Sequence, residues 1–169
     1  YIYTMKIHKV ADIQNIFNKT FGTKYNVCLV TGADEPFYKA AKCAKEKNIL
    51  FSREDFFSSA LHEIAHWCVA GSERRKLDDF GYWYIPDGRE LMAQKQFENV
   101  EVFPQALEKA FTIACQKEFI ASSDNLDIEN YDPTSFRKRI DNKHDELVST
   151  RFPARAALFI ESLTDFYRS

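Results

Sequence analysis

Apolar residues recur at helical spacing along most of this chain, which favours a fold built mainly from packed helices. In the segment 10–21, for example, the large apolar side chains fall on one helical face, and Gly22 follows as a stop signal. The predicted helices are 10–21, 52–70, a pair within 91–114 that Pro104 kinks or divides, 133–147 and 153–167.

The ends of the predicted helix 52–70 carry their own local signals. Ser52 stands in the N-cap position, and Asp55 follows three residues later, as in a capping box. Gly71 occupies the C-terminal cap position. These signals predict where the helix begins and ends.

Only short segments show a strand-like pattern. The predicted strands are 25–30 and 48–51. The residues 31–34 predict a turn, the polar and Lys-rich stretch 35–47 predicts a surface loop, and the aromatic stretch 81–85 is strand-like or loop-like. The fold class is therefore α+β: one helix-rich domain with a small sheet.

Size and charge narrow the class of protein further. The 169 residues, 45% of them hydrophobic, predict a single domain over residues 5–169, preceded by an expression remnant or N-terminal extension at 1–4. A net charge of -2 provides no overall positive field for a nucleic acid, so no direct nucleic-acid binding is expected. Apolar runs such as Ala156 to Ile160 are far too short to span a membrane, and no signal segment opens the chain, so we expect a cytoplasmic protein.

The cysteines give no sign of a thiolate metal site. Cys28, Cys43, Cys68 and Cys115 are irregularly spaced, and none forms a C-x-x-C pair. A chain of this size does not need disulfides to stabilise its core. We therefore expect four reduced thiols, most of them buried.

The most informative chemical motif is the string His62-Glu63-Ile64-Ala65-His66, which has the form H-E-x-x-H. Residues four apart on a helix point in nearly the same direction, so both imidazoles can reach one ion. Glu63 lies about 100° away around the helix, close enough to contact a metal-bound water without being a ligand. The motif predicts a metal site with Glu63 as its catalytic residue.

Two imidazoles bind a divalent ion weakly, so a third ligand is expected. Glu98 and Glu101 are the best donors, because they stand three residues apart on the next predicted helix and can both face the first one. We assign Glu101 as the ligand, and Glu98 as its supporting partner or as an acid of the substrate pocket.

A site with two histidines and one carboxylate keeps coordination positions open, as catalytic sites do. With zinc, Glu63 would serve as the general base of a hydrolase, a metallopeptidase or an endoribonuclease. With iron(II), the open positions accept dioxygen and the reaction is a hydroxylation. The spacing alone favours the peptidase, and a binding domain in which the ion only stabilises the fold remains a third alternative.

A longer match favours the iron chemistry. The runs HEIAHWCVAGSERRKLDDFGYWYIPDGRE and QFENVEVFPQALE resemble the elongation factor P hydroxylase family, as do the flanking segments GADEPFY, ASSDNL and FPARAALFI. The resemblance extends over most of the chain from about Val10, and the main departure is Ile85, where the family's YCPDG turn has cysteine.

The resemblance implies a bacterial, cytoplasmic, non-haem iron monooxygenase that hydroxylates the β-lysyl-modified lysine of elongation factor P. It implies iron(II) held by His62, His66 and a glutamate from the Glu98/Glu101 pair, with dioxygen as cosubstrate and an unidentified reductant. Zinc can replace iron in a purified sample. The family's metal-site fold is described as similar to the endoribonuclease YbeY, with the zincin-like H-E-x-x-H helix at its centre.

A long cationic substrate side chain requires an acidic and partly aromatic pocket. Asp79 and Glu98 supply negative charge, and Tyr82 and Trp83 supply rings for the alkyl stem or the ammonium group. We expect these four residues to contribute to substrate binding.

Overall fold

The computed structural model describes residues 5–79, 91–122 and 131–169, which form five α-helices, three strands and one short 3-10 helix. In chain order the elements are α1 (Val10–Phe21), β1 (Val27–Ala33), β2 (Phe37–Lys39), β3 (Asn48–Arg53), α2 (Phe57–Val69), the 3-10 helix η1 (Arg74–Lys76), α3 (Leu91–Ala114), α4 (Thr134–Ser149) and α5 (Ala154–Tyr167). The α+β class with a small sheet is confirmed.

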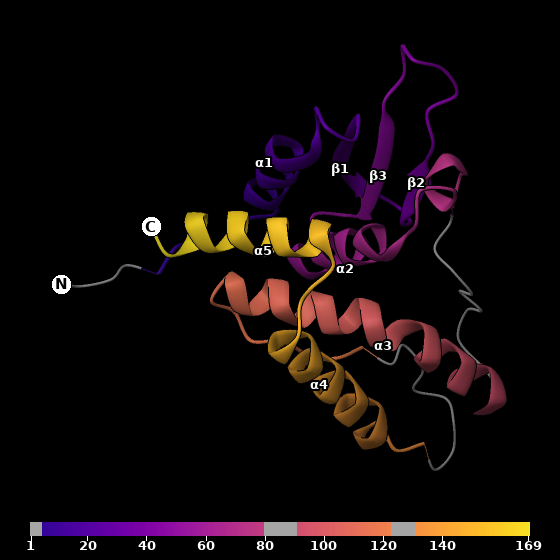
Figure 1. The fold of residues 1–169 in the computed structure, drawn as a ribbon, viewed down its shortest axis with the longest axis vertical. Coiled ribbons are helices and arrows are strands. Elements are labelled where there is room, and N and C mark those ends of the chain that lie inside the picture. Colours follow the sequence, from indigo (N-terminus) through magenta and orange to yellow (C-terminus); the bar gives the residue numbers. More distant parts are fainter. Residues whose placement is uncertain (1–4, 80–90, 123–130) are drawn as a thin grey trace.

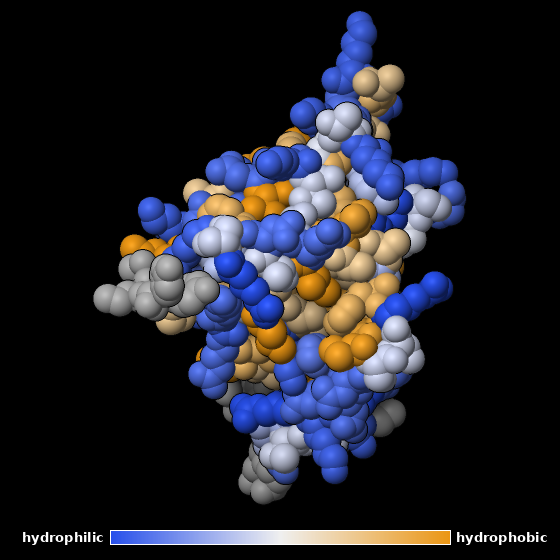
Figure 2. All heavy atoms as spheres, turned by 60° about the vertical axis from the view of Figure 1, so that its left-hand side comes forward, coloured by the Kyte–Doolittle hydropathy of each residue, from blue (hydrophilic) through white to orange (hydrophobic). Residues whose placement is uncertain are grey.

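The sheet has the strand order β1-β3-β2. β3 lies in the middle, parallel to β1 and antiparallel to β2. The connection between β2 and β3, residues 40–47, projects beyond the sheet (Figure 1), and this projecting end of the molecule is mostly hydrophilic (Figure 2). β3 leads directly into α2, so the sheet sets where the H-E-x-x-H helix begins.

The helices lie in successive layers on the sheet (Figure 1). α1 packs on β1 and α2 packs on β3. α3 then packs on both α2 and α5, and α4 packs on the far side of α3. The interface between α2 and α3, inside this stack, is where the candidate site lies.

Aromatic side chains from four helices fill the centre of the core. Phe17 and Phe21 of α1 contact Trp67 of α2, and Phe159 of α5 contacts both Phe17 and Phe111 of α3. All five side chains are buried, and aromatic pairs of this kind add to the stabilisation that burial provides. This cluster fixes α2 against the helices on either side of it.

Three of the predicted helices are confirmed with small changes at their ends. α1 has the predicted bounds, and α4 and α5 begin after Pro133 and Pro153. The side chain of Asp132 accepts a hydrogen bond from the backbone N–H of Thr134 at 2.9 Å. Proline next to the first turn and a capping carboxylate are strong local signals, which is why sequence found them.

The predicted turn at 31–34 is wrong, because β1 continues to Ala33. Gly32 has φ +90, a conformation that glycine adopts without strain, and the register with β3 shifts between Val30 and Ala33. A bulge in a strand and a turn have similar local composition, so the pattern did not separate them.

The predicted helix start at Ser52 is also wrong. Ser52 is buried within β3, the chain turns at Glu54 with φ 47, and α2 begins at Phe57 with Phe56 as an N-cap that has no side-chain hydrogen bond. The predicted Gly71 cap moves to Ala70. Pairing with β1 recruits Ser52 into the sheet, and this pairing outweighs its local capping preference.

The prediction of a loop over 35–47 is wrong in part, because it contains β2. Phe37 stacks on Phe51 of β3 with ring centroids 6.3 Å apart, a cross-strand contact that the local sequence does not reveal.

Pro104 does not divide α3, which runs through it as one helix. The carbonyl of Val100, which Pro104 cannot bond, belongs to an exposed position where water can satisfy it.

Other expectations concern the cysteines, membrane spans and the stretch 81–85. All four cysteines are free: Cys68 and Cys115 are buried, Cys28 is half-buried and Cys43 is exposed. Across the described ranges, each helix falls short of the length and apolar character that crossing a membrane requires. The stretch 81–85 lies outside the described residues.

Candidate metal centre

His62 and His66 lie one turn apart on the face of α2 that meets α3. The other face of α2 packs into the core through Leu61, Ile64 and Ala65, which orients both imidazoles toward α3. Their Nε2 atoms are 3.1 Å apart, and the ring centroids are 4.7 Å apart. Two ring nitrogens therefore point into the same small space.

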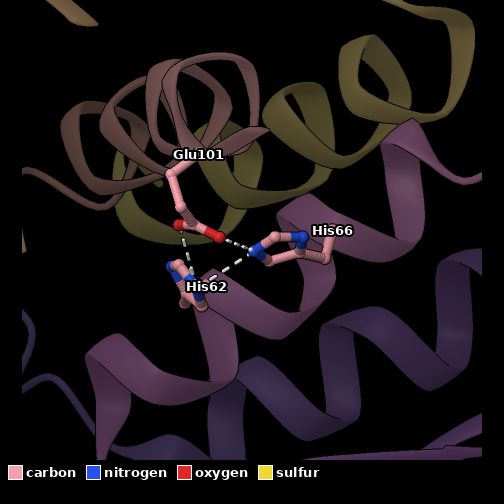
Figure 3. Close-up of side chains that lie close together, drawn as sticks. All are labelled: His62, His66 and Glu101. Atoms are coloured by element: carbon pink, nitrogen blue, oxygen red, sulfur yellow. Dashed lines mark hydrogen bonds and ion pairs between the residues drawn. The ribbon is translucent and has the colours of Figure 1, made fainter. Parts of the chain in front are cut away.

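Glu101 of α3 completes this group (Figure 3). Its Oε1 lies 2.8 Å from Nε2 of His66, and its Oε2 lies 3.5 Å from Nε2 of His62. The glutamate is only 4% exposed, whereas each imidazole keeps a fifth to a quarter of its side chain exposed. Glu101 is thus the most deeply buried of the three side chains.

These spacings fit one divalent ion. Donor atoms at about 2.1 Å from an ion, in neighbouring octahedral positions, are roughly 3 Å apart. The separations of 3.1, 2.8 and 3.5 Å among the donor atoms of His62, His66 and Glu101 have this size. The three groups could hold a metal ion on one face and leave its other positions open to water, dioxygen or substrate.

Glu98 is not part of this group, although it lies one turn before Glu101. It accepts hydrogen bonds from the hydroxyl of Tyr131 and from Gln94, and Arg139 lies 4.0 Å away. Its partners come from α3, from the segment that precedes α4 and from α4 itself. Of the two glutamates proposed from sequence, the structure brings Glu101 to the histidines and directs Glu98 to a different set of contacts.

Two supporting residues on α3 were missed by the sequence analysis. Nδ1 of His62 lies 2.8 Å from Oε2 of Glu108. Gln105 donates to Oε2 of Glu101 at 3.2 Å and forms a two-way amide pair with the backbone of Ser122, at 2.7 and 3.1 Å. The sequence signal that could have identified them is the recurrence of a polar residue at each turn of α3, among apolar residues that are largely buried.

The electrostatics of the group favour positive charge. Burial opposes ionisation of His62, but the carboxylates of Glu108 and Glu101 outweigh it and hold the pKa of His62 well above its usual range. Burial would raise the pKa of Glu101, yet the facing His62 and the hydrogen bond from His66 lower it to about 2. The same field that attracts a proton here would attract a metal cation.

Glu63 faces a small cavity beside His66. The cavity has a volume of about 40 Å³, and its lining also includes Asp79, Arg74 and Tyr38. Burial raises the pKa of Glu63, while the two neighbouring histidines act in the opposite direction. A carboxylate in this position can contact a ligand that enters the cavity beside His66.

The other residues predicted to bind substrate are Asp79, Tyr82 and Trp83, and the structure describes only the first of them. Asp79 lies in the cavity wall, where its carboxylate accepts two hydrogen bonds from Arg74, each at 3.1 Å. Tyr82 and Trp83 lie outside the described residues. The remaining histidines do not reach the site: His8 contacts the carbonyl of Cys115, and His144 contacts Asp145.

The C-terminal end of α2 is held by two arginines. Arg155 of α5 donates to the carbonyls of Trp67 and Ala70 at 2.6 and 2.5 Å, and Arg75 donates to Ala70 at 2.6 Å. Positive groups at a helix C-terminus satisfy its last carbonyls and oppose its dipole. Together they fix the end of the helix that carries both imidazoles, about one turn after His66 and two turns after His62.

Comparison with known proteins agrees with this geometry. Residues 16–169 match the elongation factor P hydroxylase family. The chain is also 46% identical over 160 residues to the elongation factor P lysine hydroxylase of Haemophilus influenzae, an alignment that covers 95% of this chain and 90% of that protein. Both matches include the whole of α2 and α3, and this chain belongs to the elongation factor P hydroxylase family.

Proposed function

We propose that this chain is an iron(II)-dependent monooxygenase that hydroxylates the β-lysyl-modified lysine of elongation factor P in the cytoplasm. The observation that carries the proposal is the convergence of His62, His66 and Glu101 on one point in a member of this family. Two imidazoles and one carboxylate with open positions beside them are typical of non-haem iron oxygenases.

The reaction inserts one atom of dioxygen into a carbon–hydrogen bond and releases the other as water, which consumes two electrons and two protons from a reductant. Bound iron(II) would supply the activation of dioxygen. Three residues of this chain would hold the ion: the deeply buried Glu101 and the more exposed His62 and His66. Because the imidazoles keep more exposed surface than Glu101, the substrate would approach the ion past them.

The cationic substrate side chain needs negative charge near this approach. Glu63 faces the cavity beside His66, and Asp79 lies in the same wall with its charge partly offset by Arg74. We therefore assign Glu63 as the main acidic group that a lysyl substrate would meet near the ion, and it would also be placed to contact water on that ion. Tyr82 and Trp83, close to Asp79 in sequence, remain predictions for contacts with the alkyl stem.

The proposal is tested by loading the metal-free protein with iron(II) under anaerobic conditions. β-Lysylated elongation factor P, dioxygen and a chemical reductant such as ascorbate are then added, and the intact mass of the substrate is measured. We expect a gain of one oxygen atom, which is absent without dioxygen, with zinc in place of iron, and with His62→Ala. No mass gain with a fully iron-loaded protein would contradict the proposal.

A cleavage assay without dioxygen tests the hydrolase alternative from the sequence analysis. A zinc-dependent hydrolase would cleave peptide or RNA without dioxygen and would lose this activity in Glu63→Gln. The family membership does not favour it. The YbeY-like arrangement of the metal site stays a prediction.

A further inference from the structure

One face of α3 carries a continuous row of buried polar side chains. They recur at alternating intervals of four and three residues, which places them along a single stripe of the helix. The members are Gln94, Glu98, Glu101, Gln105, Glu108 and Thr112, each at most 8% exposed. Burying a polar group costs free energy unless it has a hydrogen-bond partner, so each side chain of this stripe should have one.

Part of the stripe is organised around His62. Glu101 and Glu108 stand two helical turns apart and lie on opposite sides of its ring. Nδ1 of His62 is 2.8 Å from Oε2 of Glu108, while Nε2 is 3.5 Å from Oε2 of Glu101 and 3.1 Å from Nε2 of His66. The two ring nitrogens therefore have separate tasks: one contacts Glu108 and the other faces the candidate ion.

We propose that Glu108 is a positioning residue of the metal centre. By accepting the Nδ1–H of His62, it selects the tautomer whose Nε2 lone pair points at the ion, and it fixes the ring orientation. It also places a second buried negative charge behind the ligand, which makes the imidazole a stronger donor. The inference rests on the metal site of the proposed function and adds a residue outside the three ligands.

The neighbouring Gln105 supports Glu101 in the same way. Its amide nitrogen donates to Oε2 of Glu101 at 3.2 Å, and the pairing of the amide with Ser122 holds the amide in place. α3 thus carries the ligand Glu101. About one and two turns later it carries Gln105 and Glu108, each of which contacts one ligand. α3 therefore orients two ligands: Glu101, which it carries itself, and His62 of α2.

The test is a titration of metal-free protein with Co²⁺, whose visible absorption reports the geometry of its ligands. Glu108→Ala removes the acceptor, and Glu108→Gln retains the volume and an acceptor oxygen but removes the charge. We expect Glu108→Ala to weaken Co²⁺ binding by about 10- to 100-fold, with a changed spectrum, and Glu108→Gln to weaken it less. Glu161→Gln, at an exposed position of α5, is the matched control and should bind like the wild type.

Thermal unfolding in the presence of a chelator separates positioning from a structural role. If Glu108→Ala and Glu108→Gln lowered the melting temperature of the metal-free protein but bound Co²⁺ with wild-type affinity and spectrum, the inference would be overturned. If the wild-type chain bound no divalent ion, the proposed function would fail and the inference with it. Weaker binding with an altered spectrum in a folded Glu108 variant supports the inference.

Discussion

Oε1 of Glu101 lies 2.8 Å from Nε2 of His66, and this contact joins the H-E-x-x-H helix α2 to the centre of α3. Neither helix holds a complete donor set by itself. The packing of α3 on α2 is therefore what creates the candidate site, and changes on α3 should affect metal binding as strongly as changes in the histidines.

The two glutamates considered from sequence give a direct comparison. We expect Glu101→Gln to reduce metal affinity by more than about 100-fold, because loss of a ligand should exceed the loss caused by removing a ligand's hydrogen-bond partner. Glu98→Gln, one turn away, should retain the ion because its contacts are with Tyr131 and Gln94. The metal content of each variant after dialysis tests these two expectations. Retention by Glu101→Gln and loss by Glu98→Gln would reverse the assignment.

Metal removal should lower the stability of the whole domain. An ion that binds the folded state at 100 times its dissociation constant adds about 2.7 kcal/mol, which for a chain of this size corresponds to roughly 5–10 °C in melting temperature. We expect a chelator to lower the melting temperature of the wild type by this amount, and restored Co²⁺ or iron(II) to reverse it. In Glu101→Gln the chelator should have little effect, and a wild-type shift of the same size in this variant would place the ion elsewhere.

The aromatic cluster at the centre of the core should dominate stability. Phe159 is fully buried and contacts Phe17, Phe21 and Phe111, so Phe159→Ala leaves a cavity that three helices share. We expect a loss of about 3–5 kcal/mol in the free energy of unfolding, measured with urea. The adjacent Leu158→Ala, at a position 40% exposed, should cost much less. Equal losses would show that the cluster does not carry the stability assigned to it.

Alkaline pH should destabilise the protein through Cys115. Burial raises the pKa of this thiol from its ordinary value near 9 to about 12. Between about pH 9 and pH 12 the unfolded chain therefore loses a proton that the native state retains, and stability falls with pH by up to about 1.4 kcal/mol per unit. Below pH 9 both states keep the proton and the effect vanishes.

Comparison with a variant isolates this contribution. Burial and the nearby Cys115 thiol raise the pKa of Tyr167 as well, so the wild type and the variant share part of the alkaline loss. We expect Cys115→Ala to show a shallower decline in unfolding free energy above pH 9 than the wild type. Cys43→Ala, at an exposed position, is the control, and an unchanged slope in Cys115→Ala would contradict the assignment.

Sequence recovered the parts of the fold that depend on local signals. α1, α4 and α5 follow from apolar periodicity and from the glycine or prolines at their ends. It did not recover β2 or the extension of β3 through Ser52, because those segments become strands only by pairing with partners elsewhere in the chain. Strand pairing is a contact between distant segments, and local composition carries little information about it.

For the candidate site, too, local features could be predicted from the sequence and contacts between distant segments could not. The sequence by itself determined the H-E-x-x-H helix, since two histidines four residues apart must share a helical face wherever that helix lies. Only the tertiary structure showed that Glu101 and not Glu98 lies beside the histidines, and that Glu108 lies behind His62. All three glutamates lie on one stripe of α3, and the position of α2 along that stripe decides which carboxylate meets which ring nitrogen, a relation that the spacing within either helix does not contain.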